Sequence, residues 1–247
     1  MFEDLPFSVP VDQMACNLSG EFRLQQDVEK LRISNWDIVR TKRPSAFDGA
    51  LLRMTSHHLN DGNLVVSASR TSFSAYVVTR SPEFQVKYGD AERADPIGLT
   101  AIVRTVDDQI IVTVRSLTAD QNPGALYLIG GYAEPCESDG PVDLFDEAKR
   151  EVEEEIAVFD IDRSASCGVG LAYDPTFCHP ELFLLMPSKS TAAIIVAGAG
   201  NAPDRNEASQ LLACPTGNFI DENGPFGSLP KTWSFIKARQ FLQQHLL

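Results

Sequence analysis

The segment that most constrains the fold of this 247-residue chain is a predicted short amphipathic helix with an apolar stripe of Leu144, Phe145, Ala148, Val152 and Ile156. Its apolar residues recur at helical spacing, while Glu151, Glu154 and Glu155 stand at i, i+3 and i+4 on one face. Carboxylates held that close repel one another unless a cation lies between them. Because Mg²⁺ prefers oxygen ligands of this kind, the helix predicts a metal-dependent site for phosphate chemistry.

The alternative for this acidic run is an ordinary solvated helix face. A helix built for solubility would interleave basic residues at i+4, but only Lys149 and Arg150 oppose the carboxylates here. The acidic residues also crowd towards the C-terminal half of the helix, where the helix dipole disfavours negative charge. We therefore expect a group outside the helix to compensate them.

The segment resembles the Nudix box, the motif of hydrolases that split a nucleoside diphosphate linked to another moiety. Gly131 and Glu137 match the first half of the motif, and the run from Arg150 to Glu155, with Val158, matches the second. Two features depart from the family pattern. Twelve residues, 138–149, separate Glu137 from Arg150 where the family has seven, and Ala157 replaces the usual glycine. We expect the extra residues to lengthen the loop before the helix, and alanine to be tolerated unless that position needs a positive φ.

A narrower resemblance extends outside the box. Residues 94–116, 71–73 and 47–59 are similar to the animal Nudix hydrolases that cleave UDP-glucose and UDP-galactose, which also carry an N-terminal extension. The resemblance implies an α/β protein, a Nudix α/β/α sandwich at residues 95–247 preceded by a smaller α+β extension at residues 1–94. It implies a small nucleotide as substrate, and dimers are common in the family, so a homodimer is one expectation.

The resemblance also assigns roles to residues. Glu151, Glu154 and Glu155, with the carbonyl of Gly130, would hold Mg²⁺, for which Mn²⁺ could substitute. Glu151 would also accept a proton from the attacking water, Arg150 would orient a box carboxylate, and Glu137 would support the site.

Outside the box each candidate also has a plausible structural role, which is the commoner one for an exposed arginine at a strand end. Arg115 ends a predicted strand and could bind a phosphate, or it could only solubilise that strand end. Glu207 could be an additional metal-ligating carboxylate, or an ordinary surface acid. The remaining candidates are more simply read as structural, exposed or core residues, namely Tyr173, Pro175, His57, His58, His179, Phe47, Phe73 and the loop glycines Gly198 and Gly200.

Composition restricts the partners. The net charge of −13 disfavours general binding to nucleic acids or to anionic membranes. The five cysteines form no CxxC pair, and the N-terminus has no apolar signal segment, so a reduced, cytoplasmic compartment is expected. No apolar run approaches the length of a membrane span.

Local patterns predict the remaining elements. They predict a helix over 24–40, hairpins at 50–57/64–69 and 99–105/109–115, and irregular structure over 1–20. Further elements are expected at residues 71–79, 127–129, 167–173, 182–186, 211–214 and 231–247. Two functional classes remain open: a hydrolase of nucleoside diphosphate sugars, with ADP-ribose or a dinucleotide polyphosphate as the next substrates, or a Nudix-fold sensor that binds without cleaving.

Overall fold

A mixed β-sheet lies at the centre of the computed structural model, which describes residues 3–44, 46–89, 92–119 and 121–247. Within these residues the sheet has eight strands, and β11 pairs with β5 in parallel while the other pairs are antiparallel. Its main path, in spatial order, is β1 (Leu5–Pro10), β10 (Cys167–Asp174), β11 (His179–Pro187), β5 (Gly98–Arg104), β6 (Gln109–Arg115) and β12 (Ala208–Pro215). Two short strands extend it, β7 (Leu126–Tyr127) on β6 and β8 (Ile129–Tyr132) on β5.

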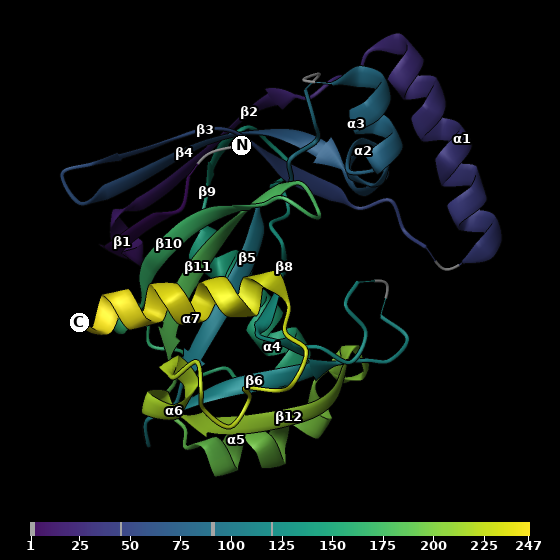
Figure 1. The fold of residues 1–247 in the computed structure, drawn as a ribbon. Helices are drawn as coiled ribbons and strands as arrows, with labels where there is room; N and C mark the ends of the chain where they lie inside the picture. Colours follow the sequence, from purple (N-terminus) through teal and green to yellow (C-terminus); the bar gives the residue numbers. More distant parts are fainter. Residues whose placement is uncertain (1–2, 45, 90–91, 120) are drawn as a thin grey trace.

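Helices cover both faces of this central sheet, as Figure 1 shows. Alternate residues of β11 point to opposite faces: Leu182 and Leu184 join the core beneath α4 (Leu144–Ile156) and α5 (Ala192–Gly198). Phe183 and Leu185 join a second core beneath α6 (Thr216–Ile220) and α7 (Trp233–Leu246). The predicted α/β class, with helices on both faces of the sheet, is confirmed.

A second sheet lies beside the first and carries three helices (Figure 1). It runs in the order β3 (Ala50–Asn60), β4 (Asn63–Ser72), β2 (Met14–Glu21) and β9 (Gly140–Val142). Its helices are α1 (Gln26–Lys42), α2 (Phe73–Thr79) and α3 (Pro82–Tyr88), which pack together around Val28, Val78 and Phe84. We call β2–β4 with α1–α3 the N-terminal unit.

The two sheets exchange strands and share one core. β1, at the start of the chain, pairs with β10 of the central sheet, whereas β9, from the insertion between Glu137 and Arg150, pairs with β2. Leu18 and Val66 of the N-terminal unit belong to the same apolar cluster as Val152 of α4. The division at residue 94/95 stays a prediction, and the insertion is an ordered strand rather than only a longer loop.

Most elements predicted from local patterns are confirmed, including the helix at 24–40 and both hairpins. The prediction of irregular structure over residues 1–20 is wrong, because β1 and β2 form there. The prolines in β1 are compatible with a strand because β1 lies at the edge of its sheet, where a missing N–H is tolerated. Gly198 and Gly200 do not lie in a loop: Gly198 ends α5, and Gly200 lies in a 3₁₀ turn.

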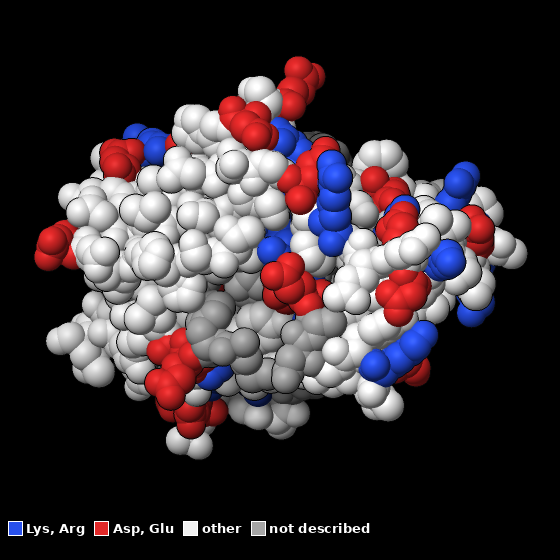
Figure 2. Space-filling model, turned by 90° about the horizontal axis from the view of Figure 1, so that it is seen from above, with Lys and Arg blue, Asp and Glu red and all other residues white. Residues whose placement is uncertain are grey.

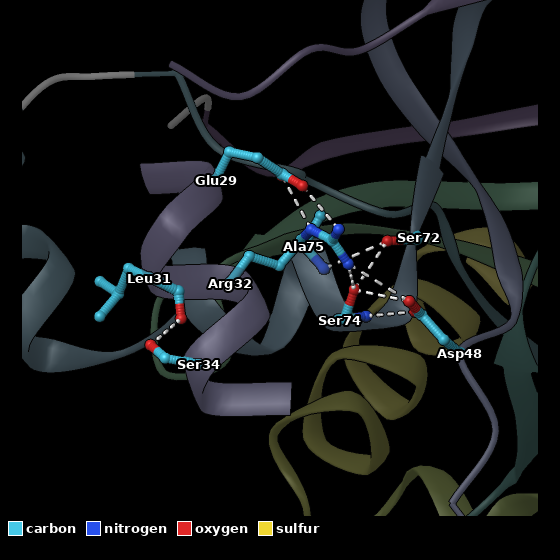
Figure 3. Close-up of polar contacts among 8 residues, drawn as sticks. All are labelled: Glu29, Leu31, Arg32, Ser34, Asp48, Ser72, Ser74 and Ala75. Carbon is cyan, nitrogen blue, oxygen red and sulfur yellow. Dashed lines mark hydrogen bonds and ion pairs between the residues drawn. The ribbon is translucent and has the colours of Figure 1, made fainter. Parts of the chain in front are cut away.

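Arg32 fastens α1 to the rest of the N-terminal unit (Figure 3). Its guanidinium donates two hydrogen bonds to Glu29, of 2.8 and 2.6 Å, and one of 2.6 Å to the hydroxyl of Ser74. Asp48 lies 3.5 Å from Nη1 of Arg32 and accepts hydrogen bonds from the backbone N–H and hydroxyl of Ser74, both of 2.7 Å. Side chains from α1, from the loop before β3 and from the start of α2 are thereby joined in one network.

The charge of the surface and the apolarity of the helices are relevant to possible binding partners. On the face shown in Figure 2, acidic and basic side chains are interspersed, and no continuous basic surface appears on it. Within the described residues, no helix combines the length and apolarity needed to cross a membrane.

Candidate active site

A cavity of about 660 Å³ lies between the central sheet, α4 and the N-terminal unit. Its volume is within the range of small-molecule sites. Gly130, Gly131 and Glu151 line it together with Arg115 and Glu207. The structure therefore brings four of the predicted site residues, Gly130, Glu151, Arg115 and Glu207, to one cavity.

The paired glycines allow β8 to approach both β5 and α4. A Cβ atom on Gly130 would collide with the backbone carbonyl of Leu99, and one on Gly131 would lie 2.6 Å from the Glu151 carboxylate. Only glycine leaves room for that carboxylate beside the strand.

Helix α4 begins and ends at defined caps. Asp143 accepts hydrogen bonds from the backbone N–H groups of Phe145 and Asp146, at 3.0 and 3.2 Å, which is the usual role of an N-cap aspartate. At the other end Ala157 adopts a left-handed conformation with φ of 54°. That position therefore does need a positive φ, and alanine costs about 1 kcal/mol there relative to a residue without a Cβ.

Arg150 gathers the box carboxylates on the exposed side of α4. It donates hydrogen bonds of 2.8 Å to Glu151 and 2.7 Å to Glu154, and Glu147 lies 3.4 Å from Nη2. This agrees with its predicted role of orienting a box carboxylate. Glu155 points the other way: it is buried, and its carboxylate accepts a hydrogen bond of 3.0 Å from the backbone N–H of Gly130.

The buried environment of the carboxylates near the cavity disfavours their ionised form. Burial, together with the charge of Glu154, raises the pKa of Glu151 to about 7 in spite of Arg150. Burial also raises the pKa of Glu155 well above its usual range, and repulsion from Glu151 and Glu207 adds to the effect. One guanidinium is too little positive charge for this group, so a further cation would stabilise it.

Glu207 and Arg115 meet at the cavity from a separate part of the chain. The backbone N–H of Ser116 donates to the carbonyl of Glu207 at 2.8 Å, which ties the 3₁₀ turn Arg205–Glu207 to the end of β6. Partial burial raises the pKa of the Glu207 carboxyl, although Arg115 opposes the rise. Arg115 stacks on Tyr127 at 4.8 Å and donates to the carbonyl of Gln121 at 3.0 Å.

Arg150, Glu154 and Glu155 lie on α4 without lining the cavity, and Glu137 lies away from both the cavity and α4. Its side chain is exposed on the loop that leads into β9, and it does not line the cavity. Glu134 lies near Arg150 instead, 3.8 Å from Nη2, and its backbone N–H donates to Glu147 at 3.1 Å. A supporting role for Glu137 stays a prediction.

The donor set fits a hard divalent cation in its chemistry, because Glu151, Glu154, Glu155, Glu207 and the Gly130 carbonyl are all oxygen ligands. The Gly130 carbonyl already accepts a hydrogen bond of 2.8 Å from Tyr127 and keeps a second lone pair. Within the described ranges, however, no three acidic, histidine or cysteine side chains are gathered closely enough to hold an ion. Arg150 forms ion pairs with both Glu151 and Glu154, so these carboxylates would have to rotate away from the guanidinium to bind a metal ion.

A buried polar network, which sequence reasoning missed, forms the opposite wall of the cavity. Glu181 is 6% exposed, and its carboxylate accepts a hydrogen bond from the Thr100 hydroxyl. The same carboxylate lies 3.0 Å from Nε2 of His179. Nδ1 of His179 lies 3.2 Å from the hydroxyl of Tyr76, which accepts a hydrogen bond of 2.9 Å from Tyr132. The one sequence signal was an acidic residue inside the apolar run of β11, where an unpaired charge would be costly.

The other sequence candidates lie in different places. Phe73 lines the cavity, whereas Phe47 is 83% exposed and does not. The Tyr173 hydroxyl donates to Asp95 at 2.7 Å, and Pro175 is exposed. His57 and His58 lie on β3, away from the cavity-lining residues.

Comparisons with known proteins give a fold likeness only. No family model matches the sequence, and no curated protein matches it. Solved structures similar to this chain include a MutT protein from Methanosarcina mazei Go1, at 17% identity and a TM-score of 0.38, covering 61% of this chain and 94% of that one.

Two further solved structures have comparable scores. A MutT Nudix hydrolase from Burkholderia pseudomallei has 17% identity and a TM-score of 0.40, covering 60% of this chain and 97% of that one. A protein described as an ADP compounds hydrolase has 12% identity and a TM-score of 0.44, covering 81% of this chain and 97% of that one. Because identities and TM-scores are low, function has to be inferred from the residues of the cavity.

Proposed function

We propose that this protein is a Mg²⁺-dependent hydrolase that cleaves the pyrophosphate of a nucleoside diphosphate sugar such as UDP-glucose. The products would be a nucleoside monophosphate and a sugar phosphate. The observation that carries the proposal is the meeting of Glu151, Glu207 and Arg115 beside the Gly130–Gly131 pair in one cavity. Gly130, Gly131 and Glu151 belong to the segment that resembles the Nudix box, whereas Arg115 and Glu207 come from outside it.

The residues divide the work as follows. Glu151, Glu154 and Glu155, with the Gly130 carbonyl and Glu207, would hold the metal. A bound Mg²⁺ ion supplies charge neutralisation for the pyrophosphate and activates water for attack. Glu151 would accept a proton from that water, since a carboxyl with a pKa of about 7 is matched to neutral pH. Arg115 would bind a phosphate oxygen, and Arg150 would hold Glu151 and Glu154 in place.

The test is a turnover assay with a panel of nucleotide sugars, ADP-ribose and a dinucleotide polyphosphate. The purified protein is incubated with Mg²⁺, with Mn²⁺ or with EDTA, products are identified by chromatography, and turnover is measured in parallel samples as the phosphate that added phosphatase releases. We expect release of nucleoside monophosphate from a nucleotide sugar that stops in EDTA. Glu154→Gln should slow it on the order of 10³-fold, because an anionic oxygen ligand of the metal is lost.

Two outcomes would contradict the proposal. Binding of a nucleotide sugar without any product would favour a sensor, the alternative that the Arg150 ion pairs support by leaving the metal site unformed. Full activity in EDTA, or wild-type turnover by Glu154→Gln, would remove the metal assignment.

A further inference from the structure

The cavity has a second end, which the N-terminal unit builds. Phe73 at the start of α2 and Arg80 at its C-terminal cap both line the cavity, together with Tyr132 and Phe177 of the central sheet and its loops. None of these four residues has a place in the proposed hydrolysis of the pyrophosphate. This end therefore contacts a different part of any ligand that fills the cavity.

Arg80 carries a charge that the described protein does not neutralise. Its side chain interacts with that of Tyr76 and forms no ion pair with any described residue, and its Nη1 atom is buried without a hydrogen-bond partner. Arg115, the cation at the other end, is by contrast bonded to the Gln121 carbonyl and lies near Glu207. A guanidinium has five N–H donors, and on Arg80 those that Tyr76 does not engage are available to a ligand.

The acidic groups nearest this end are already engaged. Asp174 is 4% exposed and accepts hydrogen bonds from the backbone N–H groups of Thr176 and Phe177, at 2.7 and 3.0 Å. Glu181 is engaged by Thr100 and His179. Neither carboxylate pairs with Arg80, so the cation remains uncompensated.

Arg80 is nevertheless held in position. Its guanidinium carbon lies 4.7 Å from the centre of the Tyr76 ring, a cation–π contact. Tyr76 is fully buried, and its hydroxyl is bonded to the Phe177 carbonyl at 2.8 Å and to Tyr132. A charged group fixed on a rigid ring needs little reorganisation to bind an anion.

The two cations act on different groups. Arg115 opposes the rise in pKa of Glu155 and Glu207, whereas Arg80 lowers the pKa of Tyr76, although burial raises it more. Arg115 therefore lies beside the box carboxylates and Arg80 beside the aromatic wall, and Arg43 also lines the cavity.

We propose that Arg80 binds an oxyanion, a carboxylate or a phosphate, on the part of the substrate remote from the scissile pyrophosphate. This inference rests on the proposed function, because the pyrophosphate has to lie at Glu151 for the remote group to reach Arg80. Guanidinium groups suit both anions, because their planar donors match carboxylate and phosphate oxygens. The substrate is then a nucleotide conjugate with an additional negative charge, such as a uronic acid or a ribose phosphate.

The experiment compares pairs of compounds that differ only in this group. UDP-glucuronate is compared with UDP-glucose for a carboxylate, and NADP⁺ with NAD⁺ for a ribose phosphate. Values of kcat/KM with Mg²⁺ are measured for wild type, Arg80→Gln, Arg80→Lys and Arg40→Gln, an exposed arginine outside the cavity. Binding of the same four compounds is measured by calorimetry, and thermal unfolding shows whether each variant folds.

We expect wild type to prefer the anionic member of at least one pair by about tenfold or more. Arg80→Gln should abolish that preference by lowering kcat/KM more for the anionic member than for the neutral one, Arg80→Lys should keep part of the preference, and Arg40→Gln should behave as wild type. The pair that shows the effect identifies the anion. Equal kcat/KM within both pairs, or a preference that survives in Arg80→Gln, would overturn the inference while hydrolysis itself stands.

Calorimetry separates the two proposals. If no compound is cleaved but the anionic member binds more tightly and loses this advantage in Arg80→Gln, the Arg80 site stands and the hydrolase fails. If no compound binds, both are overturned. Should Arg80→Gln not fold, the comparison of wild type with Arg80→Lys decides, since a lysine cannot reproduce the planar donor set.

Discussion

Arg32 in the N-terminal unit and Arg150 on α4 both gather carboxylates around a guanidinium. Arg32 contacts Glu29 and Asp48, and Asp48 is further bonded to Ser74, so each charge has a close partner (Figure 3). Arg150 lies near four carboxylates, while Glu155 and Glu207 add charge that it does not reach. The first network is nearly balanced, and the second has a large surplus of negative charge.

The pKa values show what this difference means. The hydrogen bond from Arg32 lowers the pKa of Glu29, whereas burial raises that of Glu151 although Arg150 contacts it directly. A balanced network stabilises the fold by itself. A network with surplus negative charge is stabilised by protonation or by a bound cation, which is the physical reason to place the proposed active site at α4.

The largest expected effect is on turnover, from Glu155→Gln compared with Glu29→Gln. Both changes replace one carboxyl group by an amide, and glutamine at position 155 can still accept the hydrogen bond from the Gly130 N–H. We expect Glu155→Gln to lower kcat on the order of 10³-fold. Glu29→Gln should stay within about twofold, since exposed ion pairs contribute little. Equal effects of the two changes in the turnover assay would contradict the assignment of the active site.

The next effect is on the stability of the metal-free protein as a function of pH. The folded protein keeps a proton on Glu151 up to about pH 7, whereas the unfolded chain releases it near the ordinary value of 4.5. The contribution of this proton to the free energy of unfolding is therefore fully present below pH 4.5. It is lost as the pH rises through 7, and the total loss is about 3 kcal/mol.

Urea unfolding in EDTA at pH 5 and pH 8 measures this change. In Glu151→Gln the free energy of unfolding should fall less between pH 5 and pH 8 than in wild type. The contribution of Glu29 to stability has the opposite pH dependence. Because its pKa is lowered in the folded protein, the contribution is lost as the pH falls. A metal-free protein whose stability is the same in wild type and Glu151→Gln at both pH values would refute the prediction.

A smaller effect is expected from metal binding. At Mg²⁺ concentrations about tenfold above Kd, binding to the folded state adds about 1.4 kcal/mol. For a chain of this length that corresponds to a rise in Tm of about 3–6 °C. Thermal unfolding should show the rise in wild type and in Glu29→Gln but not in Glu155→Gln. A rise that persists in Glu155→Gln would place the ion elsewhere.

The smallest effect is from Arg32→Ala, which should cost about 1 kcal/mol because the ion pairs are partly exposed. Denaturant unfolding measures the loss, and Mg²⁺ should not restore it. Loss of stability in Arg150→Ala should, by contrast, be partly restored by Mg²⁺, since the ion replaces the missing positive charge. Restoration of both variants to the same extent would remove the distinction between the networks.

Local patterns were sufficient for α4 and for the hairpins. Apolar spacing, an aspartate N-cap and turn residues such as Asp108, with φ of 59°, are encoded within a few residues of each element. The carboxylates of the site follow from the same helix, which is why Glu151, Glu154 and Glu155 could be singled out from the sequence.

The remaining parts depend on contacts between distant segments. β9 exists because β2 lies beside it, and Gly140–Pro141 alone reads as a loop. Glu181 and Arg80 reach the cavity through the pairing of β11 with β5 and the position of α2. The path of the insertion decides where Glu137 points, and no local rule supplies it.

The insertion has a consequence for dissecting the chain. Because β9 is hydrogen-bonded to β2 and β1 to β10, a cut at residue 94 would strip one neighbour from each of two strands that stay in the C-terminal fragment. Unpaired strands of this kind recruit other chains, so the fragment should aggregate. Variants of the cavity residues made in such a fragment would report on aggregated protein. They should therefore be made in the 247-residue chain.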